Sequence, residues 1–117
     1  MEDEFVSKGL AGLFAGGIGN TGSVCGSVIG AVMAIGLKKG RADTMEGALA
    51  NLAVAQEFRR RFEEEAGTIS CRELTGADLS TPEGIEEFMN SDKPATACAP
   101  AVNLAHRLAV ELLRETS

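Results

Sequence analysis

Apolar residues recur along this chain at intervals of three, four and seven positions, which is the spacing of one helix face. Together with capping and breaking residues, this spacing predicts helices over about 3–15, from 23 to 36–40, over 44–66 and over 100–115, and short helices that begin after Ser70 and Thr81. No segment shows the alternation of a strand. The sequence therefore predicts a single all-α domain over residues 1–117, a compact bundle of about four to five helices.

The same pattern predicts which helix faces are buried. In the third helix the buried stripe is expected to consist of Ala48, Leu52, Ala55, Phe58 and Phe62. The second helix is apolar on all sides, so we expect it to be the buried, glycine-rich central helix. Residues 9–37 lack charge, but glycines interrupt them, and the clean apolar run 24–37 is shorter than the about 20 residues of a membrane span. The sequence thus predicts no membrane span.

Charge narrows the function classes. The net charge is −6, and the one basic cluster, residues 59–61, is followed at once by three glutamates at 63–65. A nucleic-acid-binding protein usually has a basic face, so we expect no nucleic-acid partner. The chain opens with Met1-Glu2-Asp3-Glu4, whereas a secretory signal opens with positive charge. We therefore expect a cytoplasmic, reducing setting, in which stable disulfides are rare.

A glycine-rich loop follows the first predicted helix. Residues 17–22 match the dinucleotide fingerprint G-x-G-x-x-G, but that fingerprint has meaning only between a strand and a helix, and a helix precedes it here. The loop could present the N–H groups of Gly19 and Gly22 to an anion at the start of the second helix. A structural turn is the favoured interpretation.

Three cysteines are the candidate chemistry, because each stands where a helix is expected to begin: Cys25, Cys71 and Cys98. Helix N-termini favour the thiolate, the form that binds metals and exchanges disulfides. Cys71 is expected to be the most acidic thiol, because Ser70 caps its helix and Arg72 adds positive charge. Cys98 is expected in a flexible, exposed run between two prolines. No C-x-x-C is present, so the fold must assemble any shared site.

Three segments and one cysteine carry a resemblance to a known family: residues 19–31 around Cys25-Gly26-Ser27-Val28-Ile29-Gly30, residues 35–38, residues 71–79, and Cys98. They resemble a bacterial and archaeal family of redox-active proteins that is named for a Cys-Gly-Ala-x-x-Gly motif and four spaced cysteines. Ser27 would replace the motif alanine. The family's first cysteine is expected on an earlier helix that this chain lacks. A related domain occurs in split-Soret cytochromes, where an iron–sulfur centre is present.

The resemblance implies a redox function in which Cys25, Cys71 and Cys98 share an iron–sulfur cluster or a zinc ion. Iron–sulfur clusters normally take four thiolates, so a fourth ligand would have to come from another residue or a partner. Two alternatives stay open: a thiol/disulfide redox protein without metal, and a non-catalytic oligomerising domain with structural cysteines. We also expect a homodimer through the glycine-rich face of the first or second helix, because uncharged helices leave apolar surface. The redox partner is not identified by any residue.

Overall fold

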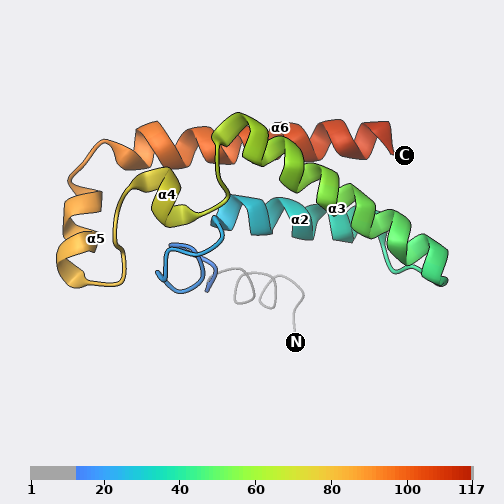
Figure 1. The fold of residues 1–117 in the computed structure, drawn as a ribbon, viewed down its shortest axis with the longest axis horizontal. Helices are drawn as coiled ribbons and strands as arrows, with labels where there is room; N and C mark the ends of the chain where they lie inside the picture. The colour runs from blue at the N-terminus through green and yellow to red at the C-terminus, as the bar shows by residue number, and fades with distance from the viewer. Residues whose placement is uncertain (1–12, 117) are drawn as a thin grey trace.

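The computed structural model describes residues 13–116 as an assembly of helices (Figure 1). The helices are α2 (Gly26–Lys39), α3 (Met45–Ala66), α4 (Cys71–Thr75), α5 (Pro82–Met89), the π-helix η1 (Pro94–Cys98) and α6 (Ala99–Glu115). In the described part of the chain the extended backbone is limited to one antiparallel bridge, between Val24 and Ser70. The all-α prediction is confirmed. Most of the helix expected over 3–15 lies outside the described residues, and its last residues, 13–15, belong to a series of turns.

Side-chain caps define three of the helix starts, and the sequence predicts two of them, at Ser70 and Thr81. Thr44 accepts a hydrogen bond from the Gly47 N–H at the start of α3, and Thr81 accepts one from the Gly84 N–H at the start of α5. Ser70 accepts one from the Glu73 N–H at the start of α4. Each bond satisfies a donor that has no partner within its helix.

The start of α2 differs from the prediction. Ser23 was expected to cap this helix, but the N-cap is Cys25, and its side chain makes no cap hydrogen bond to the backbone. The cause is a contact with a segment distant in sequence: the Ser23 carbonyl accepts a hydrogen bond from the Cys71 N–H at 2.7 Å. This bond holds Ser23 and Val24 in the bridge and delays the helix by two residues.

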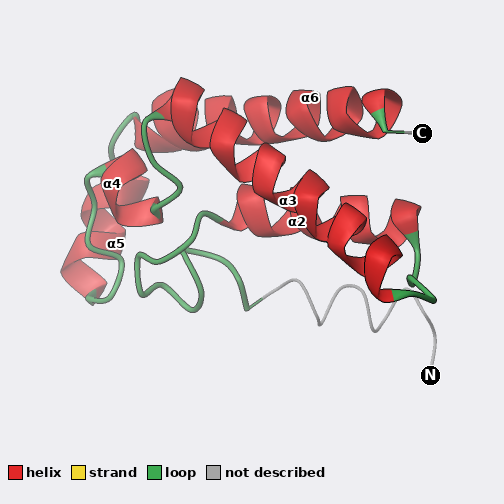
Figure 2. Ribbon diagram, turned by 45° about the vertical axis from the view of Figure 1, so that its right-hand side comes forward, coloured by secondary structure: helices red, strands yellow, loops and turns green. Residues whose placement is uncertain are grey.

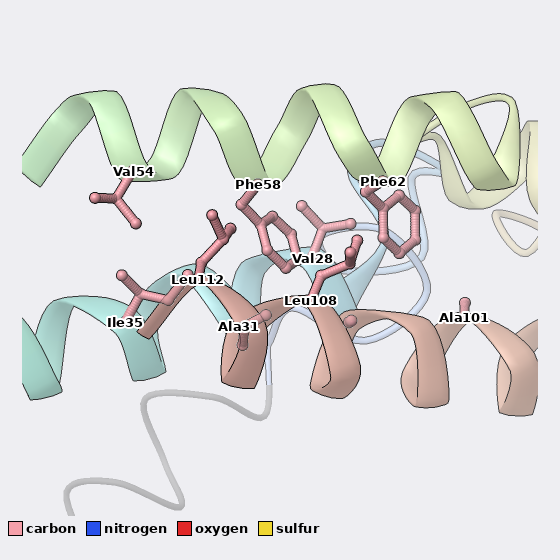
Figure 3. Packing of buried hydrophobic residues seen from close by; sticks show 11 residues of the cluster. Val28, Ala31, Ile35, Val54, Phe58, Phe62, Ala101, Leu108 and Leu112 are labelled. Atoms are coloured by element: carbon pink, nitrogen blue, oxygen red, sulfur yellow. The ribbon is translucent and has the colours of Figure 1, made fainter. Parts of the chain in front are cut away.

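The core lies where α2, α3 and α6 pack against one another (Figure 3). Phe58 and Phe62 of α3 and Leu108 of α6 are the largest side chains that are fully buried, and the two phenylalanine rings stack with centroids 6.1 Å apart. Burying a side chain of this size contributes about 1.5–3 kcal/mol. The three-helix contact is therefore the main source of apolar stabilisation in the described residues.

Two burial predictions need correction. Leu52 was expected in the core, but it is 58% exposed, and Val54 completes the stripe with Phe58 and Phe62. Leu52 instead lines an open apolar groove between α2 and α3. The second correction concerns α2, which contacts both α3 and α6 but buries only one face, that of Val28, Ala31 and Ile35. Its other face leaves Leu37 85% exposed.

The basic cluster at 59–61 is neutralised within the fold. Arg59 pairs with Glu63 at 2.6 Å, Arg60 with Glu64 at 2.7 Å, and Arg61 reaches across to Glu115 of α6 at 3.0 Å. These arginines therefore do not form a free cationic surface. Across residues 13–116, no helix combines the length and the apolar character that are needed to cross a bilayer.

Candidate functional site

The antiparallel bridge brings two of the three cysteines together. The Cys25 N–H donates to the Ile69 carbonyl at 2.7 Å, and the Cys71 N–H donates to the Ser23 carbonyl at 2.7 Å. In this register Cys25 is opposite Ile69, so Cys71 occupies the neighbouring diagonal position on the same side of the ladder. Residues 46 positions apart in sequence are thus connected by backbone hydrogen bonds immediately beside both thiols.

The glycine-rich loop forms one wall of this region. Five successive residues, 16–20, have positive φ angles between 61° and 74°, and the last N–H groups of the loop donate back to the carbonyls of Gly16 and Gly17. Gly17 is buried, and a Cβ at this position would lie 2.7 Å from Cys71 Cβ and 2.6 Å from the Ser23 nitrogen. Only glycine allows this approach, so the loop is shaped to fit against Cys71.

The third cysteine comes from η1, which packs against α4. Cys98 is the last residue of η1, which continues without a break into α6 (Figure 2). The expectation of a flexible run between Pro94 and Pro100 is therefore wrong. The Ala99 N–H donates to the Pro94 carbonyl, which is the wider π-helical pairing, and Cys98 is half-buried. Single π turns of this kind occur frequently at functional sites.

Burial and mutual repulsion raise the pKa of two of the thiols. The pKa of Cys71 is raised first by desolvation and then by the negative charges that Cys25 and Cys98 would carry as thiolates. The pKa of Cys98 is raised by desolvation and by Cys25. Because each thiolate would be felt by its neighbours, the three sulfurs form one electrostatic group, which we call the thiol cluster. All three are free thiols of intermediate exposure.

The prediction that Cys71 is the most acidic thiol is therefore wrong. Of its two supposed activators, Ser70 does cap α4, but the Arg72 side chain runs along Gly22. The charge of Arg72 is a minor influence, after the hydrogen bonds from Ser80, among those that lower the pKa of Asp78. Glu73 accepts a hydrogen bond from the Thr68 hydroxyl, and the Thr68 hydroxyl oxygen accepts one from the Ser70 N–H. The pKa of Cys71 is set by desolvation and by the two other thiols, and no cation of the described residues is among the causes of its shift.

Two residues of the site were not singled out from the sequence. Ser27 Oγ lies 3.0 Å from Cys25 Sγ, close enough for a hydrogen bond in which either atom could donate. Gly17 is the second, because its close approach to Cys71 appears only in the fold. The contact between Ser27 and Cys25 could have been found from the sequence, because a serine follows a cysteine by two residues at a predicted helix start. No local sequence pattern predicts the close approach of Gly17 to Cys71.

The two N–H groups that were considered for anion binding, those of Gly19 and Gly22, both have backbone partners in the structure. The Gly19 N–H donates to the Leu13 carbonyl at 2.8 Å, and the Gly22 N–H donates to the Gly16 carbonyl at 3.0 Å. The Gly22 and Ser23 carbonyls also accept the first two N–H groups of α4. The loop's polar groups serve its own folding and its contact with α4, which favours the structural interpretation.

The positions of the His, Cys, Asp and Glu side chains decide whether this part of the protein could hold a metal ion. Among residues 13–116, no three side chains of the types His, Cys, Asp and Glu stand where they could hold one metal ion. The lone histidine, His106, is exposed on α6, and the sequence holds three cysteines where an iron–sulfur cluster normally takes four. As they are arranged here, residues 13–116 alone do not fit an iron–sulfur cluster or a zinc ion.

Comparison with known proteins gives one match. Residues 1–112 match the family described as "Putative redox-active protein (C_GCAxxG_C_C)". No curated protein and no solved structure matches the chain.

The pattern and the fold select the same residues. The family pattern has an isolated cysteine, a cysteine within a glycine-containing motif, and two further isolated cysteines. In this chain the cysteine of the glycine-containing helix start and the two later cysteines form the thiol cluster. The match covers nearly the whole chain, and the cysteines that define the family are those that the fold gathers. This protein therefore belongs to the C_GCAxxG_C_C family of redox-active proteins.

Proposed function

We propose that this protein transfers electrons by thiol–disulfide exchange, with Cys25 and Cys71 as the working pair. The observation that carries the proposal is the backbone bridge, whose two hydrogen bonds of 2.7 Å hold the residues beside both thiols. The family match supplies the redox character. Exchange needs two thiols that approach each other and remain accessible, and both are free and half-exposed.

The proposed step exchanges a protein dithiol with the disulfide of a partner molecule. The Cys25 thiolate attacks one sulfur of the partner disulfide, forms a mixed disulfide and displaces one partner thiolate, which takes up a proton. The Cys71 thiolate then attacks Cys25 sulfur, closes the Cys25–Cys71 bond and releases the second partner thiol. The protein loses two electrons and two protons, and the partner disulfide gains both.

Closing the disulfide requires a small movement. Diagonal positions in a ladder are about 7–8 Å apart, and a disulfide joins Cα atoms at about 4.4–6.8 Å. The movable element is α4, because it has five residues and is followed by Gly76 in the left-handed conformation. Cys98, on η1, which packs against α4, is the third thiol of the cluster.

Peptide mapping tests the pair. The reduced protein is equilibrated with oxidised glutathione, its free thiols are blocked, and the tryptic peptides are identified by mass spectrometry. Trypsin separates the three cysteines into the peptides 9–38, 62–72 and 73–107. We expect a 9–38 to 62–72 crosslink in the wild type and in Cys98→Ser, and its loss in Cys71→Ser. A crosslink of 62–72 to 73–107 alone would overturn the assignment.

The other two hypotheses give different results in the same preparation. Anaerobically purified protein with stoichiometric iron or zinc would contradict the metal-free proposal and restore the shared metal site. Thiols that stay reduced at every glutathione ratio would favour a structural role for the cysteines. The expected outcome is a colourless protein without stoichiometric metal, in which oxidation consumes two thiols per chain.

We also propose that the protein forms a homodimer. The support is twofold: Val32, Ile35 and Leu52 line an apolar groove between α2 and α3, and Leu37 of α2 is 85% exposed. Exposed apolar surface of this kind is typical of interfaces. Sedimentation velocity at micromolar concentration should show twice the monomer mass, and Leu37→Glu should lower it. A wild-type monomer under these conditions would contradict the proposal.

A further inference from the structure

We propose that Ser27 is a positioning residue that makes Cys25 the attacking thiol of the cluster. This inference rests on the proposed exchange function and concerns the same site. Ser27 is the second residue of α2, and its hydroxyl oxygen lies 3.0 Å from Cys25 Sγ. The Cys25 side chain makes no cap hydrogen bond to the backbone of α2, so the sulfur is free to take the serine hydroxyl as its partner.

The contact favours the ionised form of the sulfur. In the neutral thiol either group can donate, and the bond is a weak one between neutral partners. Once Cys25 has lost its proton, only the Ser27 hydroxyl can donate, and the acceptor is charged. Hydrogen bonds to charged groups are shorter and stronger than neutral ones, so the interaction stabilises the thiolate more than the thiol. The thiolate is the attacking species in exchange.

The neighbouring titratable groups do not supply an alternative activator. After desolvation, the thiolate charge of Cys25 raises the pKa of both Cys71 of α4 and Cys98 of η1, and neither thiol is a cation that could activate its neighbours. Arg72 is directed along Gly22, with its charge acting on Asp78, and Glu73 is bonded to Thr68. The position of Cys25 at the N-cap of α2 already favours a negative charge, and the Ser27 hydroxyl adds a hydrogen-bond donor at the sulfur itself.

The order of the exchange reaction follows from this difference. Cys71 and Cys98 are desolvated without a hydroxyl partner at the sulfur in the described structure, whereas Cys25 has one. The thiol with the stabilised anion attacks the partner disulfide first, and Cys71 resolves the mixed disulfide. Ser27 therefore sets which thiol begins the reaction, without itself forming or breaking a covalent bond.

The experiment measures alkylation of each cysteine in the full three-cysteine protein. Light iodoacetamide is applied for timed intervals at pH 6 to 10, the chain is denatured, heavy reagent blocks the remaining thiols, and the three tryptic peptides give three separate rates. Ser27→Ala is expected to slow Cys25 alkylation near neutral pH by about three- to tenfold and to move its pH–rate profile to higher pH. Ser27→Thr, which keeps the hydroxyl, is expected to restore the rate.

Two controls separate positioning from a general structural effect. Ser23→Ala removes an exposed hydroxyl two residues before Cys25 and should leave all three rates unchanged. Cys98 alkylation in Ser27→Ala should equal that of the wild type, because the helix start is otherwise intact. An unchanged Cys25 profile in Ser27→Ala, or equal slowing in Ser27→Thr, would overturn the proposal.

The glutathione mapping described above distinguishes this inference from the exchange function. If Ser27→Ala slows Cys25 alkylation but the wild type forms no Cys25–Cys71 crosslink, the positioning role stands and the exchange pair fails. If the crosslink forms equally fast in wild type and Ser27→Ala, the pair stands and the role of Ser27 fails. Both parts are supported only if the variant forms the same crosslink more slowly.

Discussion

Two ends of this molecule are held together by different forces. At the packed end, α2, α3 and α6 share apolar side chains, and Phe58, Phe62 and Leu108 are fully buried. At the cysteine end, which comprises residues 13–25, α4 and η1, the connections are backbone hydrogen bonds and the close approach of glycines. The packed end is stabilised by buried apolar surface, and the cysteine end by backbone hydrogen bonds and the close fit of its glycines.

The difference has a consequence for chemistry. A thiol in a tightly packed apolar core is inert, whereas an exchange site needs sulfurs that partner molecules can reach. The cysteine end achieves contact between distant segments while leaving all three sulfurs half-exposed. Because the two ends rely on different interactions, substitutions should affect them separately, and the following predictions test that separation from the largest expected effect to the smallest.

The largest effect is expected at the packed end. Phe62→Ala removes a fully buried ring and should lower the free energy of unfolding by about 3–5 kcal/mol. Leu52→Ala, on the same helix but 58% exposed, should cost less than about 1 kcal/mol. Urea unfolding followed by circular dichroism measures both. A similar loss in the two variants would mean that Leu52 belongs to the core after all.

The next effect is expected at the cysteine end. Gly17→Ala combines a left-handed conformation, φ 74°, with overlap against Cys71 Cβ and the Ser23 backbone, and should cost about 2–4 kcal/mol. Gly19→Ala has a similar φ, 61°, but open space around it, so it should cost only about 1–2 kcal/mol. Cys71 alkylation should accelerate in the first variant and stay unchanged in the second. Equal behaviour of the two would contradict a close fit at Gly17.

The same contrast explains what the sequence could and could not predict. The positions of α3 and α6 at the packed end follow from local pattern, so both helices were located within one residue, and Phe58 and Phe62 were assigned to the core. Leu52 was misassigned because the period alone does not say how far a neighbouring helix extends. The prediction that Cys25, Cys71 and Cys98 share one site used their placement at helix starts together with the family resemblance.

At the cysteine end, local pattern gave the candidates but not their environment. Cys71 follows a cap and precedes an arginine, which predicts an acidic thiol, yet its actual neighbours are two other thiols from distant segments. The π-helix that carries Cys98 was also missed, since two prolines in a short run usually indicate a loop. Properties that depend on contacts between residues 27 or 46 positions apart are not encoded in any short window.

A smaller effect is expected from the cap of α4. Ser70→Ala removes both the hydrogen bond from the Glu73 N–H and the Ser70 hydroxyl bond to the Gly22 carbonyl at 3.1 Å. It should lower the free energy of unfolding by about 1 kcal/mol and accelerate Cys71 alkylation. Thr81→Ala, the equivalent cap of α5, should have a similar stability cost without altering Cys71. An unchanged Cys71 rate in Ser70→Ala would show that the cap does not hold the site.

The smallest effect concerns the pH at which each end loses stability. The folded state raises the pKa of Cys71, so the unfolded chain ionises this thiol first, and the stabilisation that is complete below about pH 8.5 declines as pH rises through the folded value. At the packed end, hydrogen bonds from Arg60 and then Arg61 lower the pKa of Glu57 to about 2, so its contribution to stability is present above about pH 4.3 and is lost as pH falls towards 2.

Urea midpoints of the reduced protein from pH 3 to 10 should decline at both extremes. Cys71→Ser should flatten only the alkaline decline and Glu57→Gln only the acid one, because each group acts within its own end. If either variant altered both limbs, the two ends would be coupled, and the separation argued from their different contacts would be wrong.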